Sequence, residues 1–187
     1  MMVLDDMNIK TKFCSYKPIQ LSDCKEIIRI RSSRDDSVLN TIESSLSNQE
    51  AYFKSYYERF IKQHEFYFTI SLPNEKIPQG LVRLTELDQV YRFNFQSLIL
   101  TKHAPPFMAI DAIFTMYELG FERFNRDICG PWVVPKEGEK IRQLHKKMDI
   151  ATEVMANDQY YFFIVTKDSF MSRKSYFKKL GFGVESN

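Results

Sequence analysis

Apolar residues recur at two spacings along the chain, and the shorter spacing predicts strands. Phe66, Phe68 and Ile70 alternate with polar neighbours, which is typical of a half-buried strand. The turn residues at 73–75 then predict a hairpin with the segment that begins at Gly80. A near-continuous apolar run favours a central strand at 160–165. The predicted strands are 12–19, 66–71, 80–87, 90–101, 129–134, 151–155 and 160–165.

The longer spacing, three to four residues, predicts helices between these strands. The clearest start is the capping box that runs from Ser47 to Glu50, and the predicted buried stripe of this helix is Phe53, Tyr57, Phe60 and Ile61. The most regular stripe covers 109–124, directly after the proline-containing loop 102–106. Three further helices are predicted: one capped by Ser22 or Asp23, one over 137–148, and one from the cap Asp168 to Gly181.

Composition narrows the class of protein. A chain of 187 residues is long enough for one sizeable core, so we expect residues 1–187 to form a single domain. The 26 basic and 24 acidic residues are scattered, so nucleic acid is not an expected partner. No apolar run approaches the roughly 20 residues of a membrane span, and no membrane partner is expected. Three cysteines at unrelated spacings and an acidic N-terminus without an apolar leader favour the cytoplasm.

Three stretches of the chain carry a resemblance to a known family. They are Pro78-Gln79-Gly80-Leu81-Val82, the entry 104–112 into the long helix, and Val133-Val134 followed by 141–148. These segments resemble the GNAT superfamily of N-acetyltransferases. The resemblance implies a single-domain α/β (α+β) fold with a mixed, largely antiparallel sheet of about six to seven strands flanked by helices. It also implies acetyl-CoA as co-substrate, a small-molecule amine as the other substrate, and no metal.

The resemblance places the cofactor at one strand and the loop after it. Backbone groups of the preceding strand would bind the pantetheine arm, and the N-terminus of the following helix would bind the pyrophosphate, because its N–H groups lack partners. In the family this loop is usually rich in glycine, whereas here it has none and includes Pro105 and Pro106. The predicted cofactor-binding residues are Leu98, Ile99, Leu100, Lys102, His103, Ala104, Phe107, Met108 and Ala109.

Two residues are candidates for proton transfer. His145 stands where many relatives keep a tyrosine that protonates the leaving thiolate, although it also lies on the apolar face of its helix. Glu86, with Asp88, follows the third predicted strand, where the family often places a carboxylate that serves as base. The alternative for His145 is a histidine of the core, and the alternative for Glu86 and Asp88 is that they are solvated turn residues.

The sequence leaves three functions open. The favoured one, which is implied by the resemblance of the Arg-rich segment 30–35 to the amino-sugar branch of the family, is acetylation of an amino-sugar nucleotide. Arg31 and Arg34 would then bind the paired phosphates; the alternative is a solvated surface turn. The second is acetylation of a protein N-terminus, as in ribosomal-protein acetyltransferases. The third is an inactive binding module with a GNAT-like fold, because the loop lacks glycine and Gly138 lies near a position where the family often has an asparagine. A homodimer is also left open.

Overall fold

One mixed sheet organises the protein. The computed structural model describes residues 7–33, 46–87 and 89–185. Within them eight strands pair in the order β1-β2-β3-β4-β5-β6-β8-β7, and every neighbouring pair is antiparallel except β5 and β6. The strands are β1 Ile9–Lys10, β2 Ser15–Pro18, β3 Phe66–Ser71, β4 Gly80–Thr85, β5 Arg92–Leu100, β6 Ile128–Pro135, β7 Thr152–Ala156 and β8 Tyr160–Thr166. The predicted α/β class and largely antiparallel sheet are confirmed, with one strand more than expected, since β1 is too short to show a period.

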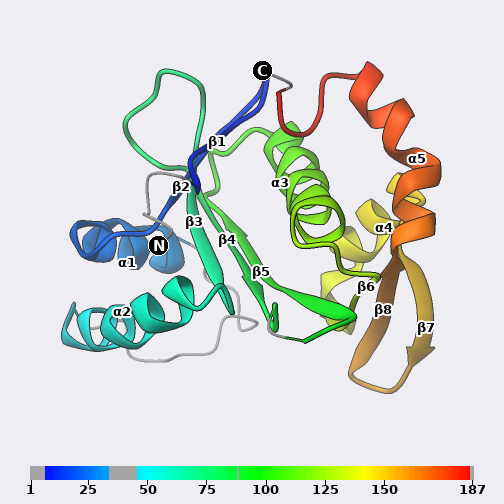
Figure 1. Ribbon diagram of the computed structural model, residues 1–187, viewed down its shortest axis with the longest axis horizontal. Coiled ribbons are helices and arrows are strands. Elements are labelled where there is room, and N and C mark those ends of the chain that lie inside the picture. Colours follow the sequence, from blue (N-terminus) through cyan, green and yellow to red (C-terminus); the bar gives the residue numbers. More distant parts are fainter. Residues whose placement is uncertain (1–6, 34–45, 88, 186–187) are drawn as a thin grey trace.

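Helices cover the two faces of this sheet (Figure 1). They are α1 Cys24–Ser32, α2 Leu46–Ile61, α3 Pro106–Glu118, α4 Glu139–Met148 and α5 Lys167–Lys179. A π-helical turn, Leu119–Arg123, extends α3, and short 3-10 turns precede α1 and α4. Figure 1 shows α1 and α2 beside β2 to β4, with α3, α4 and α5 grouped at the other side.

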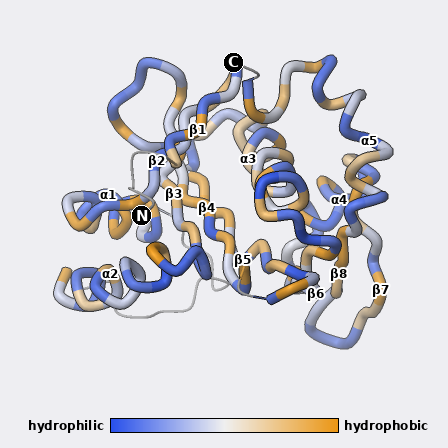
Figure 2. The backbone as a smooth tube through the Cα atoms, viewed as in Figure 1, coloured by the Kyte–Doolittle hydropathy of each residue, from blue (hydrophilic) through white to orange (hydrophobic). Residues whose placement is uncertain are grey.

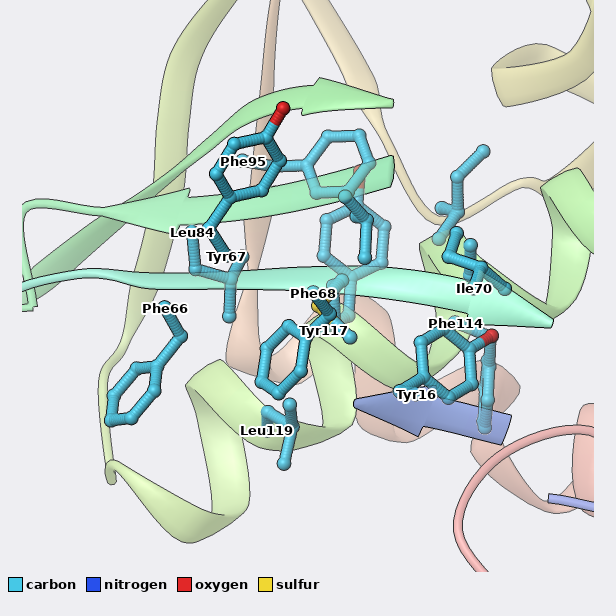
Figure 3. Close-up of a cluster of buried hydrophobic side chains, with 14 of the residues drawn as sticks. Tyr16, Phe66, Tyr67, Phe68, Ile70, Leu84, Phe95, Phe114, Tyr117 and Leu119 are labelled. Carbon is cyan, nitrogen blue, oxygen red and sulfur yellow. The ribbon is translucent and has the colours of Figure 1, made fainter. Parts of the chain in front are cut away.

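The alternation of side chains along β3 identifies the two faces. The Phe66 ring stacks on that of Phe124, which follows the π-helical turn. The carbonyl of the next residue, Tyr67, instead accepts a hydrogen bond at 3.3 Å from the Tyr56 hydroxyl of α2. Figure 3 shows Phe66 and Phe68 on one side of β3 and Tyr67 on the other. We call the side of α1 and α2 the first face and the side of α3, α4 and α5 the second face.

Burial of β3 exceeds the sequence prediction. Five of its six residues are buried, so the expected half-buried strand is wrong: helices cover both faces, and even Thr69 is 6% exposed. By contrast β8, the predicted central strand, lies between β6 and β7 but buries only Phe163 and Val165. Figure 2 shows apolar positions concentrated along the strands of the sheet.

Three helix predictions need correction. In α2 the buried residues are Tyr56 and Phe60, while Tyr57 and Ile61 are about 40% exposed; the stripe is shifted by one position toward Tyr56. The predicted capping box at Ser47 lies inside α2, which is described from Leu46. The cap of α5 is Thr166 rather than Asp168: its hydroxyl accepts from the Ser169 N–H, and Ser169 reciprocates.

Candidate functional site

The parallel strands β5 and β6 diverge soon after they meet. Their register contains only the pairs Arg92 with Ile128 and Phe93 with Cys129, although β5 continues to Leu100 and β6 to Pro135. Along the same stretch β5 stays paired with β4 as far as Leu100. From Asn94 onward the β6-facing edge of β5 therefore has no strand partner among the described residues. We call this gap the β5–β6 opening; it contains the edge on which Leu98, Ile99 and Leu100 lie.

Irregular pairing occurs in both strands at this opening. In β5, Arg83 faces Ser97 and Leu84 faces Phe95, so Gln96 is an extra residue. In β6, Cys129 pairs with Val165 and Trp132 with Phe163, so the segment Gly130-Pro131 contains one residue too many for β8. Gly130 has φ +105°, and a Cβ there would lie 2.8 Å from the Phe163 carbonyl, so glycine is required. Both bulges lie close to the point where the pairing of β5 with β6 ends.

The loop after β5 leads directly into α3. The helix begins at Pro106, with Pro105 as its cap, so the predicted start at Ala109 is wrong by three residues. Proline is well suited to the first helical position because no N–H is needed there. Lys102 and His103 are exposed, Ala104 is half-buried, and Met108 is fully buried under the helix.

Few amides remain for an anion at this helix start. The N–H groups of Ala104 and Met108 are hydrogen-bonded within the loop, to the carbonyls of Thr101 and Pro105. In the described part of the chain, the N–H groups of His103 and Phe107 donate no hydrogen bond. The Phe107 ring is 36% exposed and packs on Phe13 at 5.4 Å between centroids. The loop can therefore offer two backbone donors at a helix N-terminus, fewer than a glycine-rich loop would.

A buried carboxylate fixes the first turns of α3. Asp111 is 0% exposed and accepts hydrogen bonds from the hydroxyls of Thr11 at 2.8 Å and Tyr16 at 2.7 Å, and from the Gly183 N–H at 3.4 Å. Burial raises the pKa of Asp111, and the Tyr16 and Thr11 hydroxyls partly counteract it. The helix start is thereby attached to β2 and to the segment after α5.

Three buried polar atoms around the opening have no hydrogen-bond partner within the described residues. They are Asn94 Oδ1 on β5, Tyr117 Oη on α3 and Trp132 Nε1 on β6. The Tyr117 ring lies 6.0 Å from that of Phe95, and burial, followed by the nearby Cys129 thiol, raises its pKa, so the hydroxyl stays protonated. Buried polar atoms without partners are rare in proteins. Their position beside the β5–β6 opening is what a polar ligand there would require.

His145 lies on the second face, against the same opening. Its ring is 4.3 Å from that of Trp132 and 6.0 Å from that of Phe163, and it is 2% exposed. Burial lowers its pKa to about 4, so the imidazole is neutral at pH 7. A neutral imidazole cannot serve as the initial proton donor to a thiolate at that pH.

The other predicted site residues lie farther from this point. Glu86 is in the turn after β4, with φ +57°, and its carboxylate pairs with Arg92 at 3.2 Å. Arg31 is in the last turn of α1, close to the Tyr67 hydroxyl. Arg34 and Asp88 lie outside the described residues.

The residues at the opening are compatible with a thioester cofactor. A neutral hydroxyl and an indole N–H can donate to it, the unpaired edge of β5 can bind an extended amide-containing arm, and the start of α3 can receive phosphate. Among the described residues no group of three or more His, Cys, Asp or Glu side chains could hold a metal ion, and no helix has the length and apolar character needed to cross a membrane.

A separate hollow of about 710 Å³ lies on the second face, between β1, the end of α3 and α5. Four of its charged side chains already pair with one another: Lys178 contacts Glu118 at 2.7 Å and Lys174 contacts Glu122 at 2.5 Å. Satisfied ion pairs give a ligand little to bind, and we assign this hollow no function.

Comparisons with known proteins bear on the fold. No protein-family model matches the chain, and no curated protein sequence matches it significantly. Among solved structures, apo FdhC, a nucleotide-linked sugar GNAT, superposes with a TM-score of 0.83 at 21% identity, over 94% of this chain and 98% of that one. A protein from Vibrio cholerae assigned as a ribosomal-protein-serine acetyltransferase gives 0.72 at 13%, over 88% and 99%.

A polyamine enzyme is similar as well. A chimera of the spermidine N-acetyltransferase SpeG from Vibrio cholerae with hSSAT gives a TM-score of 0.70 at 15% identity, over 84% of this chain and 98% of that one. These structures are named for different acceptors, yet each superposes on at least 84% of this chain. The chain therefore has the fold of the GNAT acetyltransferases.

Proposed function

We propose that the protein is an acetyl-CoA-dependent N-acetyltransferase that acts on a primary amine, with an amino-sugar nucleotide as the favoured acceptor. The observation that carries this proposal is the β5–β6 opening with its unpartnered buried atoms on Asn94, Tyr117 and Trp132. The similarity to FdhC, a nucleotide-linked sugar GNAT, supports the choice of acceptor. Residues 1–187 would act as one catalytic unit.

In this proposal the cofactor lies along β5 and reaches α3. Leu98, Ile99 and Leu100 bind the pantetheine arm through their backbone, and the N–H groups of His103 and Phe107, aided by Lys102, receive the pyrophosphate. Ala104, Met108 and Ala109 shape the turn into the helix. Asp111 holds that turn in place from below.

The chemistry needs a neutral amine and a stabilised leaving group. Acetyl-CoA, when bound, supplies an activated acetyl thioester. The amine nitrogen bonds to the carbonyl carbon, the C–S bond breaks, and the proton that the nitrogen loses balances the one that the thiolate takes up. We assign hydrogen-bond donation toward the sulfur to the neutral Tyr117 hydroxyl. Glu86 is the proposed base, and His145 a neutral residue that shapes the site or accepts a proton.

A second candidate function is supported by the loop. Two prolines and two free amides make a weaker phosphate site than a glycine-rich loop, which favours a binding module without turnover. Titration of acetyl-CoA by calorimetry, followed by assays of CoA release with amino-sugar nucleotides, a peptide N-terminus and spermidine, separates the possibilities. Saturable binding and turnover with a nucleotide sugar are expected. Absence of binding at millimolar acetyl-CoA would exclude the enzyme.

Location and assembly remain proposals. Three buried, unpaired cysteines suit a reducing cytoplasm. A homodimer could use the first face of β6 and β7, where Val133 is 49% and Met155 56% exposed. Light scattering on the purified protein measures the oligomeric state directly.

A further inference from the structure

Two arginines on the first face share one buried carboxylate. Glu65, just before β3, is 2% exposed and accepts hydrogen bonds from Arg59 Nε at 2.5 Å, Arg83 Nε at 2.7 Å and the Tyr52 hydroxyl at 2.5 Å. Both guanidiniums also lie 5.5 Å from the Tyr52 ring centroid. These contacts fix each guanidinium plane through its Nε atom. Within the described part of the chain the terminal nitrogens of both donate no hydrogen bond.

A third arginine approaches the same place from α1. Arg83 faces Tyr67 across the β3–β4 ladder. Burial raises the pKa of Tyr67, while the guanidiniums of Arg31 and then Arg83 act in the opposite direction, so both lie near its hydroxyl. Glu65 is a single negative charge beside Arg31, Arg59 and Arg83, which leaves a net charge of about +2 in this cluster. We call these four residues the arginine cluster.

The arginine cluster lies on the first face, and Arg83 brings it next to β5. Arg83 pairs across β4–β5 with Ser97, next to the bulged Gln96. Asn94 points to the same first face, because its neighbour Phe95 packs on Tyr117 on the second face. The side chains of Arg59 and Arg83 are 36% and 28% exposed, so solutes can reach them. Under the proposed function, the cofactor would bind beside Tyr117 and Trp132 of the second face, whereas the cluster lies on the first face.

We propose that the arginine cluster binds the diphosphate of a nucleotide-linked acceptor, with Arg59 and Arg83 as the principal ligands and Arg31 as the third. This inference rests on the proposed function for its substrate. Two guanidiniums held in fixed planes by a carboxylate and a tyrosine present paired donors, the arrangement that bidentate phosphate recognition uses. Two adjacent phosphates match a net charge of about +2 better than the single, widely spaced charges of an acidic peptide do.

The experiment measures binding of UDP by calorimetry in the presence of saturating CoA, which occupies the loop before α3. Arg59→Gln and Arg83→Gln are each expected to weaken UDP binding about tenfold or more, since each removes a charge-assisted contact. Arg173→Gln, a half-exposed arginine of α5 on the second face, is the matched control and is expected to leave UDP binding unchanged. Glu65→Gln keeps the side-chain shape but removes the internal negative charge, so tighter UDP binding is expected.

If the arginine cluster only stabilised the fold, Glu65→Gln would not increase the affinity for UDP. Wild-type affinity for UDP in both Arg59→Gln and Arg83→Gln would overturn the inference, as would displacement of UDP by CoA or tighter binding of an acidic peptide than of UDP. If Arg83→Gln does not fold, the UDP affinities of Arg59→Gln and Glu65→Gln still test the inference. A separate CoA titration tests the proposed function. Binding of UDP without binding of CoA would support the diphosphate site and contradict the acetyltransferase proposal. Binding of CoA without binding of UDP would contradict the diphosphate site and leave the acetyltransferase proposal standing.

Discussion

The two faces of the β5–β6 opening differ in charge and in exposure. On the second face, Trp132, His145 and Tyr117 form a neutral, buried surface in which two polar atoms have no partner. On the first face, the arginine cluster is charged and partly exposed, and Glu65 holds Arg59 and Arg83 together. Under the proposed function both environments have a use, because a thioester reacts best where water is excluded and a phosphate needs cations. Changes on the second face should therefore affect stability most.

The largest expected effect is at Trp132. Its ring stacks on Phe163 at 4.9 Å and contacts His145, and it is 7% exposed. Trp132→Ala should lower the free energy of unfolding by about 4 kcal/mol, because it removes a buried ring and leaves a cavity. Urea denaturation followed by circular dichroism measures this loss. Trp132→Phe, which keeps a ring, should cost much less; equal losses in the two variants would mean that the stack contributes little.

A smaller effect comes from the pH dependence of His145. Its folded pKa of about 4 lies below the ordinary value of 6.5, so between these values the unfolded chain binds the proton more tightly. The stabilising contribution of the neutral imidazole is complete above pH 6.5 and is lost as the pH falls to about 4, by about 3 kcal/mol. Denaturation at pH 7 and pH 4.5 in wild type and His145→Gln measures it. If the free energy of unfolding changed equally with pH in both proteins, the His145 side chain would have to be exposed to solvent.

On the charged face, loss of Glu65 should cost about 2 kcal/mol. Glu65→Ala leaves Arg59 and Arg83 without their shared carboxylate, but both guanidiniums are partly exposed and can be rehydrated, which limits the penalty. The difference should shrink in 1 M salt, where screening weakens repulsion between the guanidiniums. Thermal unfolding at low and high salt makes the measurement. If Glu65→Ala lowered the free energy of unfolding as much as Trp132→Ala, the second face would not be the more important one for stability.

The smallest effect on stability is expected at Tyr117, and there activity should change instead. The hydroxyl has no partner among the described residues, so Tyr117→Phe should alter the free energy of unfolding by less than about 1 kcal/mol. Under the proposed function its turnover should fall about tenfold or more with the KM for acetyl-CoA little changed, since the hydrogen bond to sulfur matters during bond breaking. A stable variant with full turnover would mean that the hydroxyl has no part in the reaction.

Sequence periodicity predicted most of the fold because it reports local burial. It located β3, β4, β5 and α3, and it identified the strand segment at Leu98 that borders the opening. It failed where tertiary contacts decide. Tyr56 rather than Tyr57 is buried because its hydroxyl meets the backbone of Tyr67, and β3 is buried on both faces because α2 covers the side that alternation assigns to solvent.

Less of the candidate site than of the fold could be predicted from the sequence. Tyr117 belongs to the apolar stripe of α3, and nothing in that stripe marks its hydroxyl as unpartnered. Glu65 and Arg83 are 18 positions apart and are joined only by the pairing of β3 with β4. A short-range signal did exist at Pro106, since proline is favoured at the first helical position, and it could have placed the start of α3 correctly.

The hydrogen bond from the Gly183 N–H to Asp111 spans 72 positions, and the Val184 N–H likewise reaches Glu118 at 2.7 Å. On the ribosome, α3 is therefore made long before the residues that secure it. Until α5 and the segment behind it have emerged, Asp111 can accept hydrogen bonds from Thr11 and Tyr16 but not from Gly183. Under the proposed function, a nascent chain stalled just after α5 should thus bind the phosphates of CoA more weakly than the full chain.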